Sequence, residues 1–196
     1  MTILVSALVG LAGESQMAAL VGGFIPALAP YQAVTWAGPP IPAWLTPLTA
    51  TLLHGGVFHL LFNMVMFVYC GREVERALGS KAIGVLYFIG AYAAAAGQWA
   101  QDPQSMMPMI GASGAISAVV AAYALLYGRN RARQIGPLSA GVLHAVWLGA
   151  AWTIINLLVG YATLTDQPVA IGAHIGGFIA GLILTRPLLL WRYRDA

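Results

Sequence analysis

Two residues of this chain are of the types that act together as a nucleophile and its base. Ser113 follows Gly111 and Ala112 in a strongly apolar stretch, and His174 lies in a later one. A serine hydroxyl becomes a useful nucleophile when a neighbouring base takes its proton. Ionisable side chains are energetically costly inside a sequence apolar enough to span a membrane, so they commonly mark functional sites. The pair therefore predicts nucleophilic catalysis by serine and histidine.

The residues around Ser113 suit that chemistry. We expect Ser113 to begin a helix, where backbone N–H groups without helical partners can face a developing anion. Gly111 and Gly114 let another backbone, such as a substrate strand, approach closely. The same small residues are also typical of close helix packing in membranes. On this motif alone, both interpretations stay open.

His174 is followed by glycines at helical spacing. Gly177 and Gly181 form a Gly-xxx-Gly ridge, which allows tight contact with a neighbouring helix. If that neighbour is the helix that begins at Ser113, His174 lies beside the serine. A membrane histidine that only hydrogen-bonds across helices is the alternative, and the glycines on both segments favour the role of base.

Three further polar residues precede this pair. His59 and Asn63 are four residues apart, so they share one helix face, and each can donate a hydrogen bond. With the Ser113 backbone N–H, they predict an oxyanion hole. Polar contacts between helices, worth about 1 kcal/mol, are the alternative interpretation. For His54 we expect a hydrogen bond that anchors a loop.

The remaining ionisable residues favour a dyad and no metal. Asp102 and Asp166 fall in loops, so no carboxylate is placed to orient His174, and a Ser–His dyad is expected rather than a triad. His144 is expected near an inner helix end, with a structural role. The chain has no His-Glu-x-x-His pair, so neither a metal site nor a cofactor site is predicted.

Composition assigns the chain to the membrane. Charged residues make up only 8% of the 196 residues, against roughly 25% in soluble domains. Apolar stretches near the length of about 20 residues that spans a bilayer recur between polar breaks. Such spans must be helical, because lipid-facing backbone has to satisfy its own hydrogen bonds. The predicted spans are 51–70, 82–100, 112–128, 138–161 and 170–190.

The first 50 residues are less regular. The apolar segment 2–12 is about half a spanning helix, so we expect the chain to begin partway along its first helix; a first helix that runs through Glu14 is the alternative. Prolines and tryptophans fill the connection that follows, which favours a structured loop in the membrane surface. We expect one membrane domain over 1–196, with these parts: a partial first span and outer segment at 1–25, an outer membrane-embedded loop at 26–50, spans two to six at 51–190, and a cytoplasmic tail at 191–196.

Charge predicts the orientation. Lysine and arginine are absent from the connections 26–50, 101–111 and 162–169. They gather in the alternate connections and in the C-terminal tail: Arg72, Arg76, Lys81, Arg129, Arg131, Arg133, Arg186, Arg192 and Arg194. Positive residues remain cytoplasmic, so we expect six spans with both termini inside the cell. Basic residues dispersed in this way do not form a nucleic-acid-binding face.

This orientation brings the polar residues to one depth. His59 lies in the outer half of the second span, and Ser113 and His174 begin the fourth and sixth. Three helices therefore contribute polar groups a few residues below the external surface. We predict that they form one site, which opens to the extracytoplasmic side.

The residues resemble the rhomboid family of intramembrane serine proteases. The matching motifs, in the family's order, are HGGVFHLLFN at 54–63, the glycines and glutamates of 71–79, GASGA at 111–115, and AHIGG at 173–177. The resemblance implies an all-α, six-helix bundle with a water-filled cavity. It also implies that Ser113 is the nucleophile, His174 the general base, and His59, Asn63 and the Ser113 N–H the oxyanion hole. The fifth span corresponds to the family's mobile substrate gate, with Trp147 and Trp152 as bulky contacts.

The chain departs from the family's pattern at three places. Its first helix is short or truncated. Leu45 follows Trp44 where many relatives have arginine, so the usual anchoring of the first loop is not expected. Ser117 stands where some relatives carry a tyrosine that packs on the catalytic histidine.

We therefore predict an intramembrane serine endopeptidase in the cell membrane, whose partners are transmembrane protein substrates and the lipid bilayer. The oligomeric state is not specified by the sequence. Two alternatives stay open. One is a catalytically inactive relative that binds membrane clients, although such relatives usually lack the serine or the histidine. The other is a small transporter or channel, which needs polar groups in the inner halves of the spans; there leucine, valine, alanine and glycine predominate.

Overall fold

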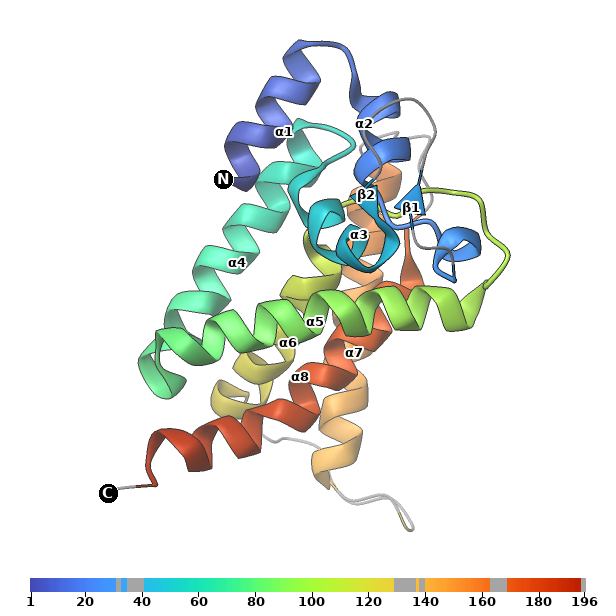
Figure 1. The fold of residues 1–196 in the computed structure, drawn as a ribbon. Helices are drawn as coiled ribbons and strands as arrows, with labels where there is room; N and C mark the ends of the chain where they lie inside the picture. Colours follow the sequence, from blue (N-terminus) through green and yellow to red (C-terminus); the bar gives the residue numbers. More distant parts are fainter. Residues whose placement is uncertain (31–32, 35–40, 129–136, 138–139, 163–168, 195–196) are drawn as a thin grey trace.

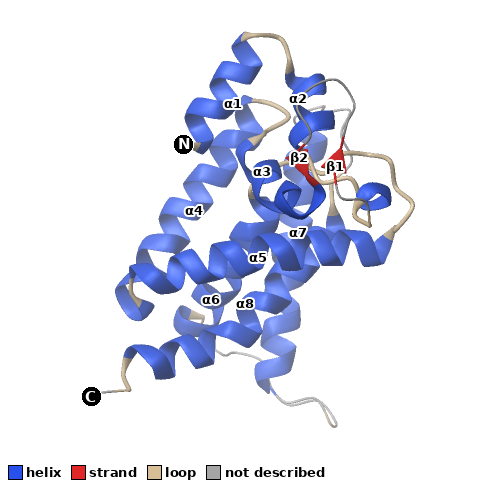
Figure 2. Cartoon of the chain, viewed as in Figure 1, coloured by secondary structure: helices blue, strands red, loops and turns tan. Residues whose placement is uncertain are grey.

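Helices account for nearly all of the regular structure (Figures 1 and 2). The computed structural model describes residues 1–30, 33–34, 41–128, 137, 140–162 and 169–194. The helices are α1 (Thr2–Leu11), α2 (Ser15–Gly22), α3 (Thr46–Thr49), α4 (Val57–Leu78), α5 (Ser80–Gln101), α6 (Ser113–Tyr127), α7 (Ala140–Ala162) and α8 (Ile171–Arg192). One antiparallel pair of short strands, β1 (Ala33–Val34) and β2 (Ile41–Pro42), lies near α3. The predicted all-α membrane fold is confirmed.

Helix length and composition identify the membrane-spanning elements. Among the described residues, α4, α5 and α8 are each 22 residues long and apolar enough to cross a bilayer. With 15 residues, α6 is about 22 Å long, shorter than a hydrocarbon core of about 30 Å. Its first ten residues, 113–122, are all buried among its neighbours. A helix of this length is too short to cross the hydrocarbon core by itself.

The N-terminal segment is broken at Glu14. Helix α1 ends at Leu11 and α2 begins at Ser15, with Gly13 in a left-handed conformation between them (φ 73°). No single helix runs through Glu14, so that alternative is wrong. None of the α1 residues is buried.

The second span begins later than predicted. Residues 46–52 form α3 and a 3₁₀ turn, and α4 starts only at Val57. The pair Gly55–Gly56 explains the late start, because glycine disfavours a helix interior. At its other end α4 continues to Leu78, since charged residues that leave the apolar core still favour a helix. Hydropathy therefore located the apolar run at 51–70 but not the helix.

The core is built around α8, which packs against both α5 and α6 (Figure 1). A Cβ at Gly176 would overlap the Ala93 carbonyl on α5, and one at Gly177 would overlap the Gly114 carbonyl on α6. Helices approach this closely in membranes only through small residues. The seam that Gly177 begins continues at Gly181. It sets the N-terminal ends of α6 and α8 side by side.

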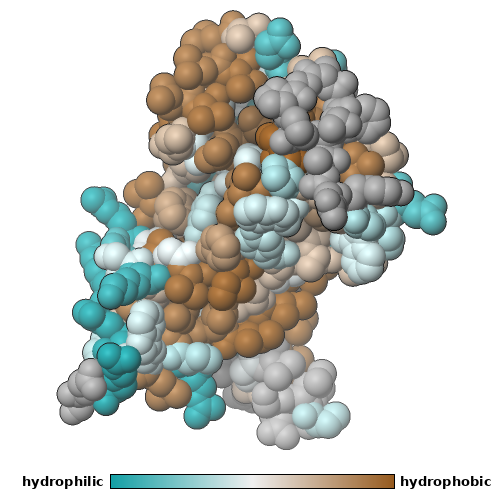
Figure 3. Space-filling view, in the orientation of Figure 1, coloured by the Kyte–Doolittle hydropathy of each residue, from teal (hydrophilic) through white to brown (hydrophobic). Residues whose placement is uncertain are grey.

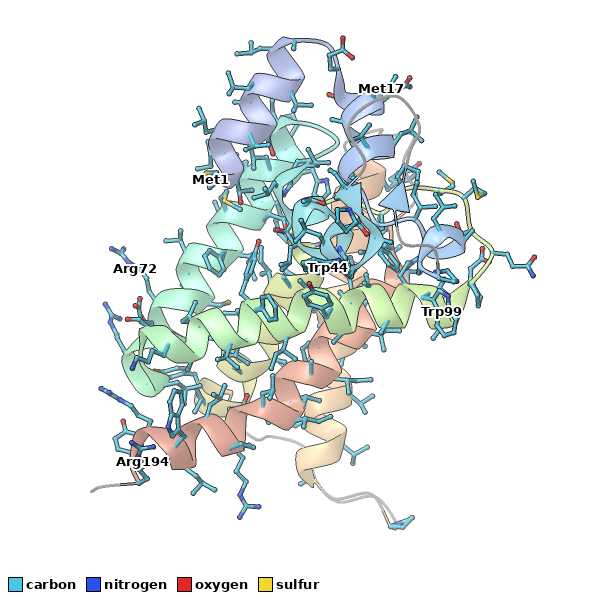
Figure 4. All side chains as sticks on the ribbon, in the orientation of Figure 1. Met1, Met17, Trp44, Arg72, Trp99 and Arg194 are labelled. Atoms are coloured by element: carbon cyan, nitrogen blue, oxygen red, sulfur yellow. The ribbon has the colours of Figure 1, made fainter. Side chains whose placement is uncertain are left out.

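The described basic residues lie toward one end of the bundle. Hydrophilic side chains gather where α4 and α8 finish (Figure 3), and Arg72 and Arg194 lie at that end, away from Trp44 and Trp99 (Figure 4). The Tyr193 hydroxyl donates to the Ala77 carbonyl at 3.3 Å, which holds the end of α8 against the end of α4.

Several predicted features lie outside the described residues. They are 31–32 and 35–40 of the outer loop, the inner connection with Arg129, Arg131 and Arg133, and Asp166.

Candidate active site

Ser113 and His174 are hydrogen-bonded to one another. Ser113 is the first residue of α6 and His174 the fourth of α8. Ser113 Oγ lies 2.8 Å from His174 Nε2, and both residues are buried, at 8% and 3% exposed. This distance suits transfer of the serine proton to the imidazole. His174 Nδ1 is buried, and none of the described residues hydrogen-bonds to it.

The N-terminus of α6 supplies backbone donors beside the serine. The first main-chain bond of the helix runs from the Ile116 N–H to the Ala112 carbonyl, at 2.9 Å. The N–H groups of Ser113 and Gly114 precede it, so they belong to the set that a helix cannot satisfy internally. Such groups favour an anion at that end of the helix.

Glycine is required at the turn before Ser113. Gly111 has φ 109°, a conformation that other residues rarely adopt. A Cβ there would also meet the His59 ring at 2.7 Å. The Gly111 N–H donates to the Ala50 carbonyl at 2.9 Å, and Met109 pairs with Phe24 in both directions. The loop that precedes Ser113 is thus held by backbone hydrogen bonds to residues far away in the sequence.

His54 also holds the loop that precedes Ser113. The Ala112 N–H donates to His54 Nε2 at 3.4 Å, and His54 Nδ1 lies 3.0 Å from Ser6 Oγ. Since Nε2 accepts, the proton is on Nδ1, which donates to Ser6; Ser6 in turn donates to the Leu52 carbonyl at 2.7 Å. His54 precedes the α4 span, and burial, with a smaller contribution from His59, lowers its pKa to about 3. A neutral His54 therefore links α1 to the loop before the nucleophile.

A cavity of about 80 Å³ adjoins the pair. A buried water needs roughly 10–15 Å³, so this space is large enough for several. Ser113, His174 and His59 line it, and Gly111 and Gly114 form part of its wall. The supporting glycines and the predicted donor His59 therefore share one cavity with the serine and the histidine.

Asn63 differs from the prediction. Its Nδ2 donates to the His59 carbonyl one turn back, at 2.8 Å, and the residue is not among those that line the cavity. Its Oδ1 is buried without a hydrogen-bond partner among the described residues. The shared helix face is correct, but in this arrangement the amide points along α4.

Asn156 lines the cavity and was not predicted. It lies on α7, 7% exposed, and donates from Nδ2 to the Trp152 carbonyl at 2.9 Å. An isolated amide in an apolar span is a signal that could have identified it. His144, by contrast, packs beside Gly128 near the opposite end of α7. Within the described residues, no three His, Cys, Asp or Glu side chains gather as a metal site would require.

Comparison with known proteins identifies relatives of this chain. A family model described as the Rhomboid domain matches residues 42–191. The chain is 32% identical over 143 residues to RHOMBOID-like protein 5 of Arabidopsis thaliana, which covers 70% of this chain and 42% of that protein. It is 28% identical over 132 residues to the Rhomboid protease GlpG of Yersinia pestis and of Yersinia pseudotuberculosis, which covers 67% of this chain and 44% of each relative. The chain thus spans less than half the length of these curated relatives.

Proposed function

The chain belongs to the rhomboid family, and we propose that it is a serine endopeptidase that cuts transmembrane protein substrates within the membrane. The observation that carries this proposal is the 2.8 Å contact between Ser113 Oγ and His174 Nε2, buried in a helical bundle of membrane composition. A buried serine–histidine contact beside a cavity that can hold water suits hydrolysis better than it suits passive binding of membrane clients.

The proposed reaction uses each group at the site. Ser113 Oγ attacks the carbonyl carbon of the scissile bond while His174 Nε2 takes the serine proton. The negative charge of the tetrahedral intermediate is stabilised by His59 and by the free N–H groups at the start of α6. His174 then protonates the leaving amine, and a water from the cavity hydrolyses the acyl-enzyme with His174 again as base.

The substrate must unwind where it is cut. A peptide bond in a membrane helix is protected by the helix's own hydrogen bonds, so its segment has to unwind before Ser113 can reach the carbonyl. We therefore propose that helix-destabilising residues near the cut site promote cleavage, and that the cut lies near the outer membrane face.

Replacement of the nucleophile tests this function. Ser113→Ala is expected to abolish cleavage of a model transmembrane substrate and labelling by a fluorophosphonate probe, because it removes the hydroxyl that would form the acyl-enzyme. His174→Ala should also abolish labelling. Ser80→Ala, at the opposite end of the bundle, is the matched control and should behave as the wild type. Cleavage that survives Ser113→Ala would reject the proposal, and a wild-type protein that binds substrate without labelling would favour the inactive relative.

A further inference from the structure

One aromatic side chain of α7 reaches both members of the pair. Trp152 is 3% exposed, whereas Trp147 on the same helix is 67% exposed. The Trp152 indole N–H donates to Ser117 Oγ at 2.7 Å, and Ser117 Oγ donates to the Ser113 carbonyl at 2.7 Å. The single hydroxyl proton of Ser117 is thus used fully. Two hydrogen bonds join α7 to the backbone of the serine.

The same indole packs against the imidazole. The ring centroids of Trp152 and His174 are 6.4 Å apart with planes at 62°, an edge-on contact. On α4, Phe62 stacks on the indole at 5.9 Å. The indole is therefore held by Phe62 and by its bond to Ser117, and it presents an edge contact to His174.

The ring contact restrains a histidine whose second ring nitrogen has no orienting partner among the described residues. A catalytic base is ordinarily oriented by a third group that binds its second nitrogen. His174 Nδ1 has no such partner among the described residues, and Nε2 is occupied by Ser113. Ring packing is the restraint that remains on this side of the imidazole. Its source is a helix different from the two that carry the pair.

We propose that Trp152 is a positioning residue for His174. Through its hydrogen bond to Ser117 and its ring contact, it keeps the imidazole within hydrogen-bonding distance of Ser113. The proposal rests on the proposed function. It has a consequence for α7: any displacement of the helix that carries Trp152 away removes both contacts together. The alignment of His174 with Ser113 therefore depends on the position of α7.

Three variants test the coupling. Ser117→Ala removes the acceptor, Trp152→Phe removes the donor but keeps a ring, and the double variant removes both. We expect each single change to slow fluorophosphonate labelling in detergent about three- to tenfold, the effect of one lost buried hydrogen bond. A small probe is used because its reaction does not require a substrate helix to enter. Trp191→Phe, at a 44% exposed position near the far end of α8, is the control and should label at the wild-type rate.

The double variant separates positioning from stability. Removal of both partners of a buried hydrogen bond leaves no unpaired group, so thermal stability should return toward the wild-type value. Labelling should nevertheless stay slow, because the phenyl ring at position 152 has no hydrogen bond to fix it against His174. If labelling recovers together with stability, the role of Trp152 is only structural and the inference is wrong.

A spectroscopic measurement does not depend on activity. In protein carrying ¹³C-labelled histidine, the ring signals of His174, assigned by their loss in His174→Gln, are expected to broaden or split in Ser117→Ala. Unchanged signals and unchanged labelling in both single variants would reject the positioning role alone. Absence of labelling in the wild type would instead reject the proposed function.

Discussion

His59 and Asn63 lie one turn apart on α4, yet they meet the site differently. The His59 ring lines the cavity and packs on Gly111, whereas the Asn63 amide donates to a carbonyl of its own helix. A donor stabilises an oxyanion only when it already points to where the charge develops. At the scale of residues, the two predicted donors are therefore unequal.

Truncation of these two residues should show the difference. His59→Ala is expected to lower kcat for a model substrate by about 10²–10³, the effect of losing one oxyanion donor. Asn63→Ala should cost about tenfold or less, because it removes one hydrogen bond to the helix backbone. Both variants should keep a cooperative thermal transition in detergent. Equal losses of kcat would mean that Asn63 turns into the cavity during the reaction.

The interpretation of Ser117 also changes at this scale. Ser117 stands where some relatives carry a tyrosine that packs on the catalytic histidine. In this chain an aromatic ring still packs on His174, but it comes from α7, and Ser117 is the group that receives its hydrogen bond.

At the scale of elements, the contact between α6 and α8 determines whether the dyad exists. Ser113 and His174 sit at the starts of these helices, and Gly177 and Gly181 place no side chain of α8 between the two backbones. Because α6 is short and enclosed by its neighbours, its start cannot move without repacking them.

A methyl group in this seam should separate the helices. Gly177→Ala is expected to destabilise the protein by about 1–3 kcal/mol, as overpacking does. It should also slow fluorophosphonate labelling, because α8 carries His174 away from Ser113. Thermal unfolding in detergent and the labelling rate measure the two effects. Gly84→Ala on α5, where a Cβ meets nothing within 4 Å, is the matched control; a Gly177→Ala protein as stable and as reactive as this control would contradict the seam's role.

At the scale of the whole molecule, the described basic residues mark one end of the bundle, and the cavity lies toward the other. Arg72, Lys81 and Arg192 belong to the ends of α4, α5 and α8 that meet there, while Ser113 and His174 begin their helices at the opposite ends. With the positive-inside rule, this arrangement supports our proposal that the active site opens to the extracytoplasmic side.

Cysteine labelling in intact cells tests this orientation. In a Cys70→Ala background, a cysteine at Gln104, which is exposed after α5, should react with a membrane-impermeant maleimide. A cysteine at Ser80, exposed at the α4–α5 turn, should react only after the membrane is permeabilised. The reverse pattern would show that the site opens to the cytoplasm.

Composition and spacing alone determined the class of this protein and the residues worth testing. A low charged fraction, apolar runs of spanning length and basic residues in alternate connections are local properties, so they predict the helical membrane fold, which is confirmed. They also predict which helix ends carry Ser113, His174 and His59. Glycines at helical spacing indicated that two of these helices would pack closely.

Only the tertiary structure decided how these groups meet. The start of α4 depends on the turns packed before it, and the direction of the Asn63 amide depends on its rotamer. The contacts of Trp152 with Ser117 and of Asn156 with the cavity depend on the rotation of α7 about its own axis. That rotation is set by packing against helices distant in the sequence, and an apolar span with no polar face carries no pattern that reports it.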